Sequence, residues 1–220
     1  MNPEELRSHS EFPLPRRGVG VRLTNTGKRF NREWIFRHVD HVFVHGGSYA
    51  ITGPNGSGKS TLLQVIAGAI QHSEGMVEYQ GDSIQQPYQQ VSIATPYLDL
   101  IEEMTAKEML QFHSKFKPLV LPFAEILQKA GLSGAAEKQI RNFSSGMKQR
   151  LKLAQAFFSD TAVLLLDEPT TNLDENGTAL YHQLIRDHTN NRLVIISSND
   201  KQEYNFCEEV IEMGKYKSQI

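Results

Sequence analysis

The stretch from Gly53 to Thr61 reads GPNGSGKST, and it decides how the rest of the chain is interpreted. It follows the apolar residues SYAI and opens the segment TLLQVIAGAI, where Leu62, Ile66 and Ile70 recur at helical spacing. The pattern G-x-x-x-x-G-K-[ST] between a strand and a helix is typical of a loop that surrounds a polyphosphate with backbone N–H groups. A plain glycine-rich turn would explain the glycines but not the lysine, so the stretch predicts a nucleotide site.

Each residue of this phosphate loop has an expected role. The Lys59 ammonium is predicted to reach the terminal phosphates, and the Ser60 hydroxyl is predicted to bind Mg²⁺. The helix that follows directs its positive end toward the same anion. The predicted nucleotide-binding residues of the loop are Gly53, Pro54, Asn55, Gly56, Ser57, Gly58, Lys59, Ser60 and Thr61.

A second candidate site lies in VLLLDEPTTNLD, where Asp167 and Glu168 directly follow four apolar residues. An aspartate at the mouth of a buried strand, beside a phosphate loop, is suited to hold Mg²⁺ or its water. The adjacent Glu168 is predicted to act as a general base on an attacking water. The alternative is a solvated acidic pair that ends the strand before Pro169.

The overall composition is that of an ordinary globular protein. The 220 residues are 39% hydrophobic and 22% charged, with a net charge of −2, so a general electrostatic attraction to nucleic acid is not expected. No apolar stretch approaches the roughly 20 residues that cross a bilayer. Residues 1–18 lack the apolar middle of a secretory signal, and we interpret them as a flexible arm on a cytoplasmic protein.

The order of the elements predicts an α/β fold. GVRLTNTGKRF and HVDHVFVHGGSYAITG alternate as half-buried strands do, and SEGMVEYQGDSI indicates a turn and a short strand. The middle of the chain, residues 104–158, is mostly helical in pattern. AVLLLD and LVIISS are buried strands on either side of a helix around GTALYHQLIRDH. This order predicts a mostly parallel sheet with a helical appendage.

The order of GPNGSGKST, FSSGMKQR and LLLDEPTTNLD resembles the nucleotide-binding subunit of ABC transporters, from about Val21 to about Gly214. The resemblance implies a P-loop NTPase core, an N-terminal antiparallel β region and a helical subdomain at about residues 100–158, within one ATP-binding domain over residues 19–220. The family's signature, Leu-Ser-Gly-Gly-Gln, reads here from Phe143 to Met147 as FSSGM. By resemblance, Ser144 and Gly146 bind the γ-phosphate held by a second subunit, whereas the simpler alternative is that Ser144 only caps its helix.

Two other residues acquire roles from the same resemblance. Phe30 stands where the family has an aromatic side chain that stacks on adenine, and the alternative is an ordinary core aromatic. Asp174 matches the family's aspartate at the dimer interface, and the alternative is a helix N-cap. The basic side chains that follow the signature are expected on a solvated face; they are Lys148, Arg150 and Lys152.

Outside the signature, the chain departs from the family at two further places. TPYLDLIEEMT lacks the glutamine that the family uses near Mg²⁺, and Thr95 or Tyr97 is a candidate to offer an oxygen in its place. In LVIISSND, Leu193 to Asp200, the family's histidine is replaced by Asn199. Asparagine donates a hydrogen bond but accepts no proton near pH 7, so Asn199 is predicted to be a substitute for a catalytic residue, which serves in part if the histidine acts by positioning and loses transition-state stabilisation if it acts by charge.

The resemblance implies an ATP-hydrolysing subunit that is peripheral on the inner face of the cell membrane and closes as a dimer around ATP and Mg²⁺. The variant signature resembles that of exporter-type subunits. The expected partners are a separate transmembrane permease and a second ATP-binding subunit, in a homodimer or a heterodimer. Two alternatives remain, an ATP-gated clamp with little or no turnover and a soluble ABC ATPase that serves no transporter.

Overall fold

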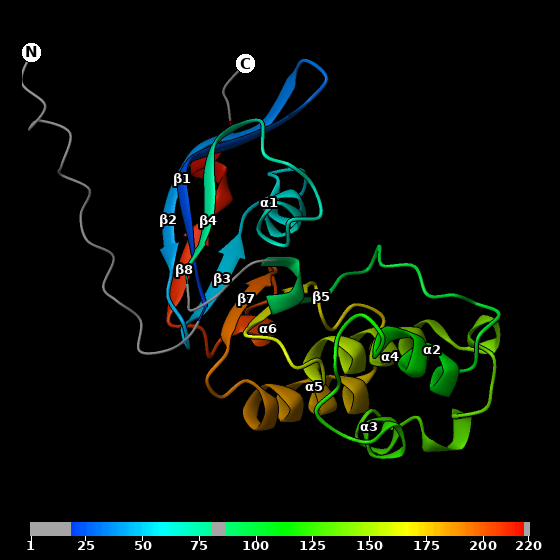
Figure 1. The fold of residues 1–220 in the computed structure, drawn as a ribbon. Coiled ribbons are helices and arrows are strands. Elements are labelled where there is room, and N and C mark those ends of the chain that lie inside the picture. The colour runs from blue at the N-terminus through cyan, green and yellow to red at the C-terminus, as the bar shows by residue number, and fades with distance from the viewer. Residues whose placement is uncertain (1–18, 81–86, 218–220) are drawn as a thin grey trace, which may run out of the picture.

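Two β-sheets organise the chain in the computed structural model, which describes residues 19–80 and 87–217 (Figure 1). The expected arm at residues 1–18 lies outside the described residues. The strands are β1 Gly20–Phe30, β2 Glu33–Phe43, β3 Ser48–Thr52, β4 Glu74–Gln80, β5 Val91–Ala94, β6 Val163–Asp167, β7 Leu193–Ser197 and β8 Glu209–Glu212. The α-helices are α1 Lys59–Ile66, α2 Ala106–His113, α3 Phe123–Lys129, α4 Ser145–Phe157, α5 Glu175–His188 and α6 Lys201–Tyr204.

The five-stranded sheet is parallel throughout, in the order β5-β6-β7-β3-β8. The neighbouring strands β6, β7 and β3 therefore end at one edge, where they lead into the acidic residues, Ser198 and the phosphate loop. Two main-chain hydrogen bonds connect neighbouring segments at this edge. Glu168 N–H donates to Ser197 O at 2.8 Å, and Ser198 N–H donates to Ile51 O at 3.1 Å. Ligands of open α/β sheets bind at such carboxyl edges.

Both faces of the parallel sheet are covered, which explains the continuous apolar runs of β6 and β7. Leu164, Leu166, Val194 and Ile196 join the core beneath α2, α3, α4 and α5. The alternate residues Val163, Leu165, Leu193 and Ile195 join the core with α1 and the antiparallel sheet. Figure 1 shows α1 with the antiparallel strands on one side and α2 to α4 on the other. The predicted fold class is confirmed.

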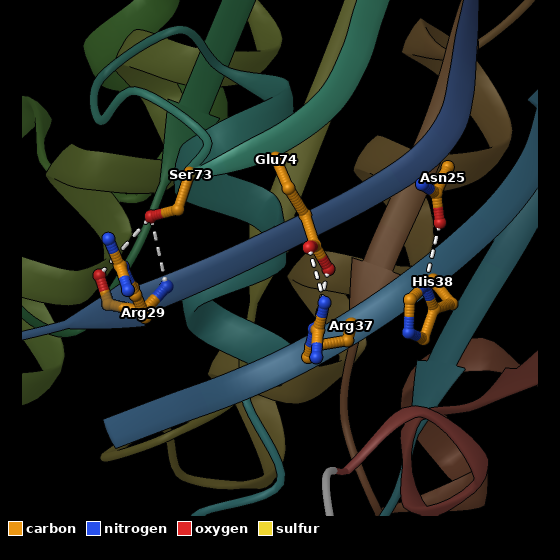
Figure 2. A network of polar contacts seen from close by, with 6 residues as sticks. All are labelled: Asn25, Arg29, Arg37, His38, Ser73 and Glu74. Atoms are coloured by element: carbon orange, nitrogen blue, oxygen red, sulfur yellow. Dashed lines mark hydrogen bonds and ion pairs between the residues drawn. The ribbon is translucent and has the colours of Figure 1, made fainter. Parts of the chain in front are cut away.

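The three-stranded antiparallel sheet has the order β2-β1-β4, and polar contacts hold its hairpin to β4 (Figure 2). The Arg37 guanidinium donates to both carboxylate oxygens of Glu74, at 2.8 and 2.7 Å. Arg29 N–H donates to Ser73 Oγ at 3.1 Å. These contacts fix the end of β1, where Phe30 lies.

Helix α1 ends at Ile66, so the expectation that helical spacing continues to Ile70 is wrong in its last turn. Gly68 has a φ of +71°, a left-handed conformation that ends a helix. Two of the helices that follow β5, α2 and α4, begin at side-chain caps, because Thr105 forms a capping box with Glu108 and Ser144 caps α4. Among the described residues, no helix is both long and apolar enough to cross a membrane.

Candidate functional site

The phosphate loop runs from the end of β3 to the first turn of α1 and packs tightly against the antiparallel sheet. Gly58, at the start of α1, has a φ of +94°, and a Cβ there would lie 2.8 Å from Ile35 Cγ2. Only glycine adopts this left-handed backbone conformation readily and also leaves room for the Ile35 side chain. At the tip of the loop, Pro54, Asn55 and Gly56 are exposed, so their backbone groups are open to a ligand.

The lysine of the loop is buried and faces inward. Lys59 is 6% exposed, and its ammonium donates to Gly53 O at 2.7 Å, which holds the charge across the mouth of the loop. Ser60 and Thr61 are half-buried beside it, in the first turn of α1. Ser57 is 1% exposed, and its Oγ has no hydrogen-bond partner within the described chain. A phosphate oxygen is a natural acceptor for such a group.

Asp167 and Glu168 occupy different environments although they are adjacent. Asp167, the last residue of β6, is 3% exposed, and its Oδ1 lacks a hydrogen-bond partner in the described part of the chain. Glu168 is exposed and has a φ of +43°, which is costly for a residue with a side chain. An unpartnered buried carboxylate oxygen is suited to a cation, and an exposed, strained glutamate is suited to contact a bound substrate.

Asn199 follows β7 and reaches the phosphate loop directly. Its Oδ1 accepts a hydrogen bond from Gly53 N–H at 3.1 Å. This contact bridges residues that are far apart in the sequence, and it leaves the amide N–H₂ of Asn199 as a donor. The catalytic candidates Lys59 and Asn199 therefore meet at Gly53, from two sides.

The signature residues act as a helix start within one chain. Ser144 is exposed, and its Oγ accepts from Met147 N–H at 3.2 Å as the N-cap of α4. Asp174 caps α5 in the same way, because its Oδ1 accepts from Gly177 N–H at 2.8 Å. Both capping alternatives are therefore present, and both cap residues lie exposed on the surface. A Cβ at Gly146 would approach Asn172 O within 2.9 Å, so α4 contacts the loop that follows Glu168.

Phe30 is an exposed aromatic and not a core residue. Its side chain is 47% exposed, and the Lys28 ammonium lies 4.7 Å from the ring centroid. Lys28 Nζ also donates to Gln71 O at 2.7 Å, which anchors the cation beside the ring. A ring that is fixed and open to solvent is suited to stack on a base.

The segment that lacks the family's glutamine is tied to α4. Thr95 is 8% exposed, and its Oγ1 accepts from Tyr97 N–H at 3.1 Å, whereas Tyr97 itself is 77% exposed. Lys152 Nζ donates to Pro96 O at 2.6 Å, and burial lowers the pKa of this ammonium. The sequence does not predict this contact of Lys152, because its acceptors are main-chain carbonyls far away along the chain.

The basic face of α4 is only partly solvated, because all three side chains are half-buried. Besides the contact of Lys152, Lys148 forms an ion pair with Glu102 at 2.5 Å, and Arg150 donates to Gly131 O at 3.1 Å. Gln149, also missed from the sequence, is 3% exposed and donates to Pro169 O at 2.8 Å. These side chains connect α4 to its neighbours.

Two hollows in the described surface lie away from this edge. One, of about 290 Å³, lies between α3 and α5, and the other, of about 370 Å³, lies where β6 and β7 begin. Neither is lined by a residue of the phosphate loop. At the candidate nucleotide site itself, the tip of the loop, Pro54, Asn55 and Gly56, is exposed in a single chain.

Comparison with known protein families gives a match to the ABC transporter model over residues 36–171, more than half of the chain. The chain belongs to the ABC transporter family. It is 30% identical over 201 residues to the uncharacterized ABC transporter ATP-binding protein YybJ of Bacillus subtilis, covering 88% of this chain and 92% of that protein. This ABC subunit is an ATP-binding, ATP-hydrolysing component of a transporter.

Two further proteins resemble this ABC subunit. The cytochrome c biogenesis ATP-binding export protein CcmA of Cupriavidus pinatubonensis is 32% identical over 161 residues, which is 70% of this chain and 71% of CcmA. The ATP-binding cassette MJ0796, solved as a dimer in a post-hydrolysis state with ADP and Pi, superposes with a TM-score of 0.75. That match covers 87% of this chain and 93% of MJ0796 at 24% identity, and it shows the shared fold.

Proposed function

We propose that this ABC subunit drives an export-type permease by closing as a dimer on two ATP molecules and reopening after hydrolysis. Residues 19–220 form the ATP-binding domain in this proposal, with a helical subdomain at about residues 100–158. The permease is a separate transmembrane protein, and the subunit lies on the inner face of the membrane. The name of CcmA, an export protein, supports the direction of transport.

Each ATP site is shared between two chains in this proposal. One chain supplies the phosphate loop, Asp167 and Glu168, and the other supplies Ser144 and Gly146. The single observation that carries the proposal is that the tip of the phosphate loop and the start of the signature helix are both exposed, because each surface requires a partner that the other can supply. Asp174, exposed at the start of α5, lies at the same interface in this proposal. The pair is a homodimer or a heterodimer.

The residues present fit a Mg²⁺ ion. Asp167 offers a buried carboxylate oxygen that has no partner among the described residues, and Ser60 offers a hydroxyl at the first turn of α1. When bound, Mg²⁺ supplies positive charge against the β- and γ-phosphate oxygens. Phe30 stacks on the adenine, which places the triphosphate along the loop.

The proposed reaction is attack of water on the γ-phosphorus of ATP. Glu168 orients the water and accepts its proton while the new P–O bond forms. The bond from the γ-phosphorus to the bridging oxygen breaks, and ADP and inorganic phosphate leave. Lys59 balances the charge that develops on the phosphate oxygens, and the Asn199 amide donates a hydrogen bond to one of them.

Steady-state ATPase activity of the purified subunit with Mg²⁺ tests this assignment in three forms. Wild type is expected to hydrolyse ATP, Glu168→Gln is expected to lose the activity, and Asn199→His is expected to turn over at least as fast as wild type. The histidine adds a charge that asparagine lacks. Activity that persists in Glu168→Gln rejects Glu168 as the base.

A further inference from the structure

Thr170, two residues after Glu168, is held by a buried carboxylate. Its N–H donates to Glu203 Oε1 at 2.7 Å, and its hydroxyl donates to the same oxygen. Glu203 is 3% exposed and lies in α6, four residues after Asn199. The contact therefore joins the acidic loop, residues 168–174, to the switch segment, residues 198–204.

Further contacts fix both sides of this joint. The Tyr181 hydroxyl of α5 donates to Glu203 O at 2.6 Å, and Gln149 of α4 donates to Pro169 O at 2.8 Å. None of these bonds involves the phosphate loop. The acidic loop is thus held to the switch segment and to the signature helix, and each of these carries a residue proposed to contact the γ-phosphate.

Glu203 uses only part of its capacity for hydrogen bonds. Its Oε2 is buried and has no hydrogen-bond partner within the described chain. An unsatisfied buried carboxylate oxygen destabilises a fold, so stability of the fold alone does not account for this side chain. Two bonds to one carboxylate oxygen, however, fix the position of Thr170 closely.

We propose that Glu203 is a positioning residue for ATP hydrolysis, which keeps the Glu168 loop and the Asn199 segment in one fixed arrangement. This inference rests on the proposed function, because it takes Glu168 and Asn199 as the groups that act on the γ-phosphate. The bonds of Glu203 and Thr170 described above go to residues outside the phosphate loop and do not involve Phe30. Loosening this joint must therefore lower kcat and leave the KM for ATP nearly unchanged.

Glu203→Gln is the matched test, because it keeps the shape and one acceptor oxygen but weakens the charge-assisted bonds. We expect kcat to fall about tenfold and KM to stay within about twofold. Thr170→Val, which removes the hydroxyl, is expected to act in the same direction, and Thr170→Ser, which retains it, is expected to behave as wild type. The exposed Glu208 on the same terminal region provides the control variant Glu208→Gln, with normal kcat.

A double-mutant cycle separates positioning from general support of the fold. In an Asn199→Ala background, Glu203→Gln is expected to lower kcat less than it does in wild type, because only the position of the Glu168 loop still matters there. The same fold-change in both backgrounds overturns the proposal. So does a Glu203→Gln enzyme with normal kcat, or one whose KM rises as kcat falls.

Hydrogen exchange gives a measurement that does not depend on turnover. Glu203→Gln is expected to raise exchange in peptides that cover residues 168–174, whereas Glu208→Gln leaves it unchanged. Unchanged exchange in Glu203→Gln overturns the inference. Full activity in Glu168→Gln, measured in parallel, instead rejects the proposed function, so the two failures are distinguishable.

Discussion

Gly146 lies where the signature helix contacts the acidic loop, and its replacement by alanine tests how closely the two pack. A Cβ at this position would lie 2.9 Å from Asn172 O. Non-bonded carbon atoms are best separated by about 3.5–4.0 Å, and the atom that the Cβ would meet is main-chain oxygen, so the backbone must move. Asn172, with a φ of +65°, lies between Glu168 and Asp174.

Two opposing effects set the magnitude. Alanine in place of glycine inside a helix stabilises by about 1 kcal/mol. Forcing extra volume into a packed site costs about 1–3 kcal/mol. The expected net effect is a destabilisation of about 1 kcal/mol, which for a chain of this size lowers Tm by about 2–4 °C. The displaced acidic loop is also expected to lower ATPase activity.

Thermal unfolding followed by circular dichroism measures this effect, with Gly134→Ala as the control. A Cβ at Gly134 would have no atom within 4 Å, so its Tm is expected to equal or exceed that of wild type. The reasoning is refuted if Gly146→Ala unfolds at or above the wild-type temperature and retains full activity. That result would mean that the acidic loop moves away from the added Cβ without loss of stability or activity.

Three other predictions follow from single contacts. Lys59→Met removes the buried ammonium held by Gly53 O, and ATP affinity measured by calorimetry is expected to fall at least about tenfold; unchanged affinity contradicts the role of Lys59. Gly75→Ala places a Cβ 2.1 Å from Asn25 O at a φ of +75°, so a loss of more than about 2 kcal/mol in the free energy of unfolding is expected by denaturant titration; a loss below that of Gly146→Ala refutes it. Burial lowers the pKa of His113 to about 4, below its unfolded value of about 6.5, so as pH falls the unfolded chain binds a proton here before the folded chain does. The free energy of unfolding is therefore expected to fall between about pH 6.5 and about pH 4, by at most about 3 kcal/mol. His113→Gln is expected to flatten that part of the pH profile of Tm, and an unchanged slope argues against it.

The parts of the site that the sequence predicted are those encoded locally. The phosphate loop carries its glycines, lysine and hydroxyl in one run of sequence. Asp167 ends a continuous apolar run, which is the pattern of a strand that is buried on both faces of a sheet. The parallel strands then bring Asn199 beside Gly53, because β7 lies between β6 and β3. The early end of α1 was missed because one left-handed glycine outweighed continued apolar spacing.

The parts that the sequence did not predict depend on contacts between distant segments. Glu203 and Lys152 look like ordinary surface charges in the sequence, yet each reaches main-chain groups of a loop that is far away along the chain. Gln149 has the same character, because its acceptor, Pro169 O, belongs to a loop that its local sequence does not indicate. No local pattern encodes such pairs, since the fold itself creates the proximity.

The central claim is that two chains share each ATP site, and a cross-linking experiment tests it most directly. One chain carries Asn55→Cys at the tip of the phosphate loop and the other carries Ser144→Cys, both with Glu168→Gln to block hydrolysis and Cys207→Ser to remove the native thiol. Joined thiols require Cα atoms within about 7 Å, so only close apposition forms the bond.

With ATP and Mg²⁺ under oxidising conditions, the mixture is predicted to yield a covalent dimer, and neither variant alone is predicted to do so. A mixture that cross-links equally well without ATP would contradict the account, and one that stays monomeric with ATP would contradict a shared site between two copies of this chain.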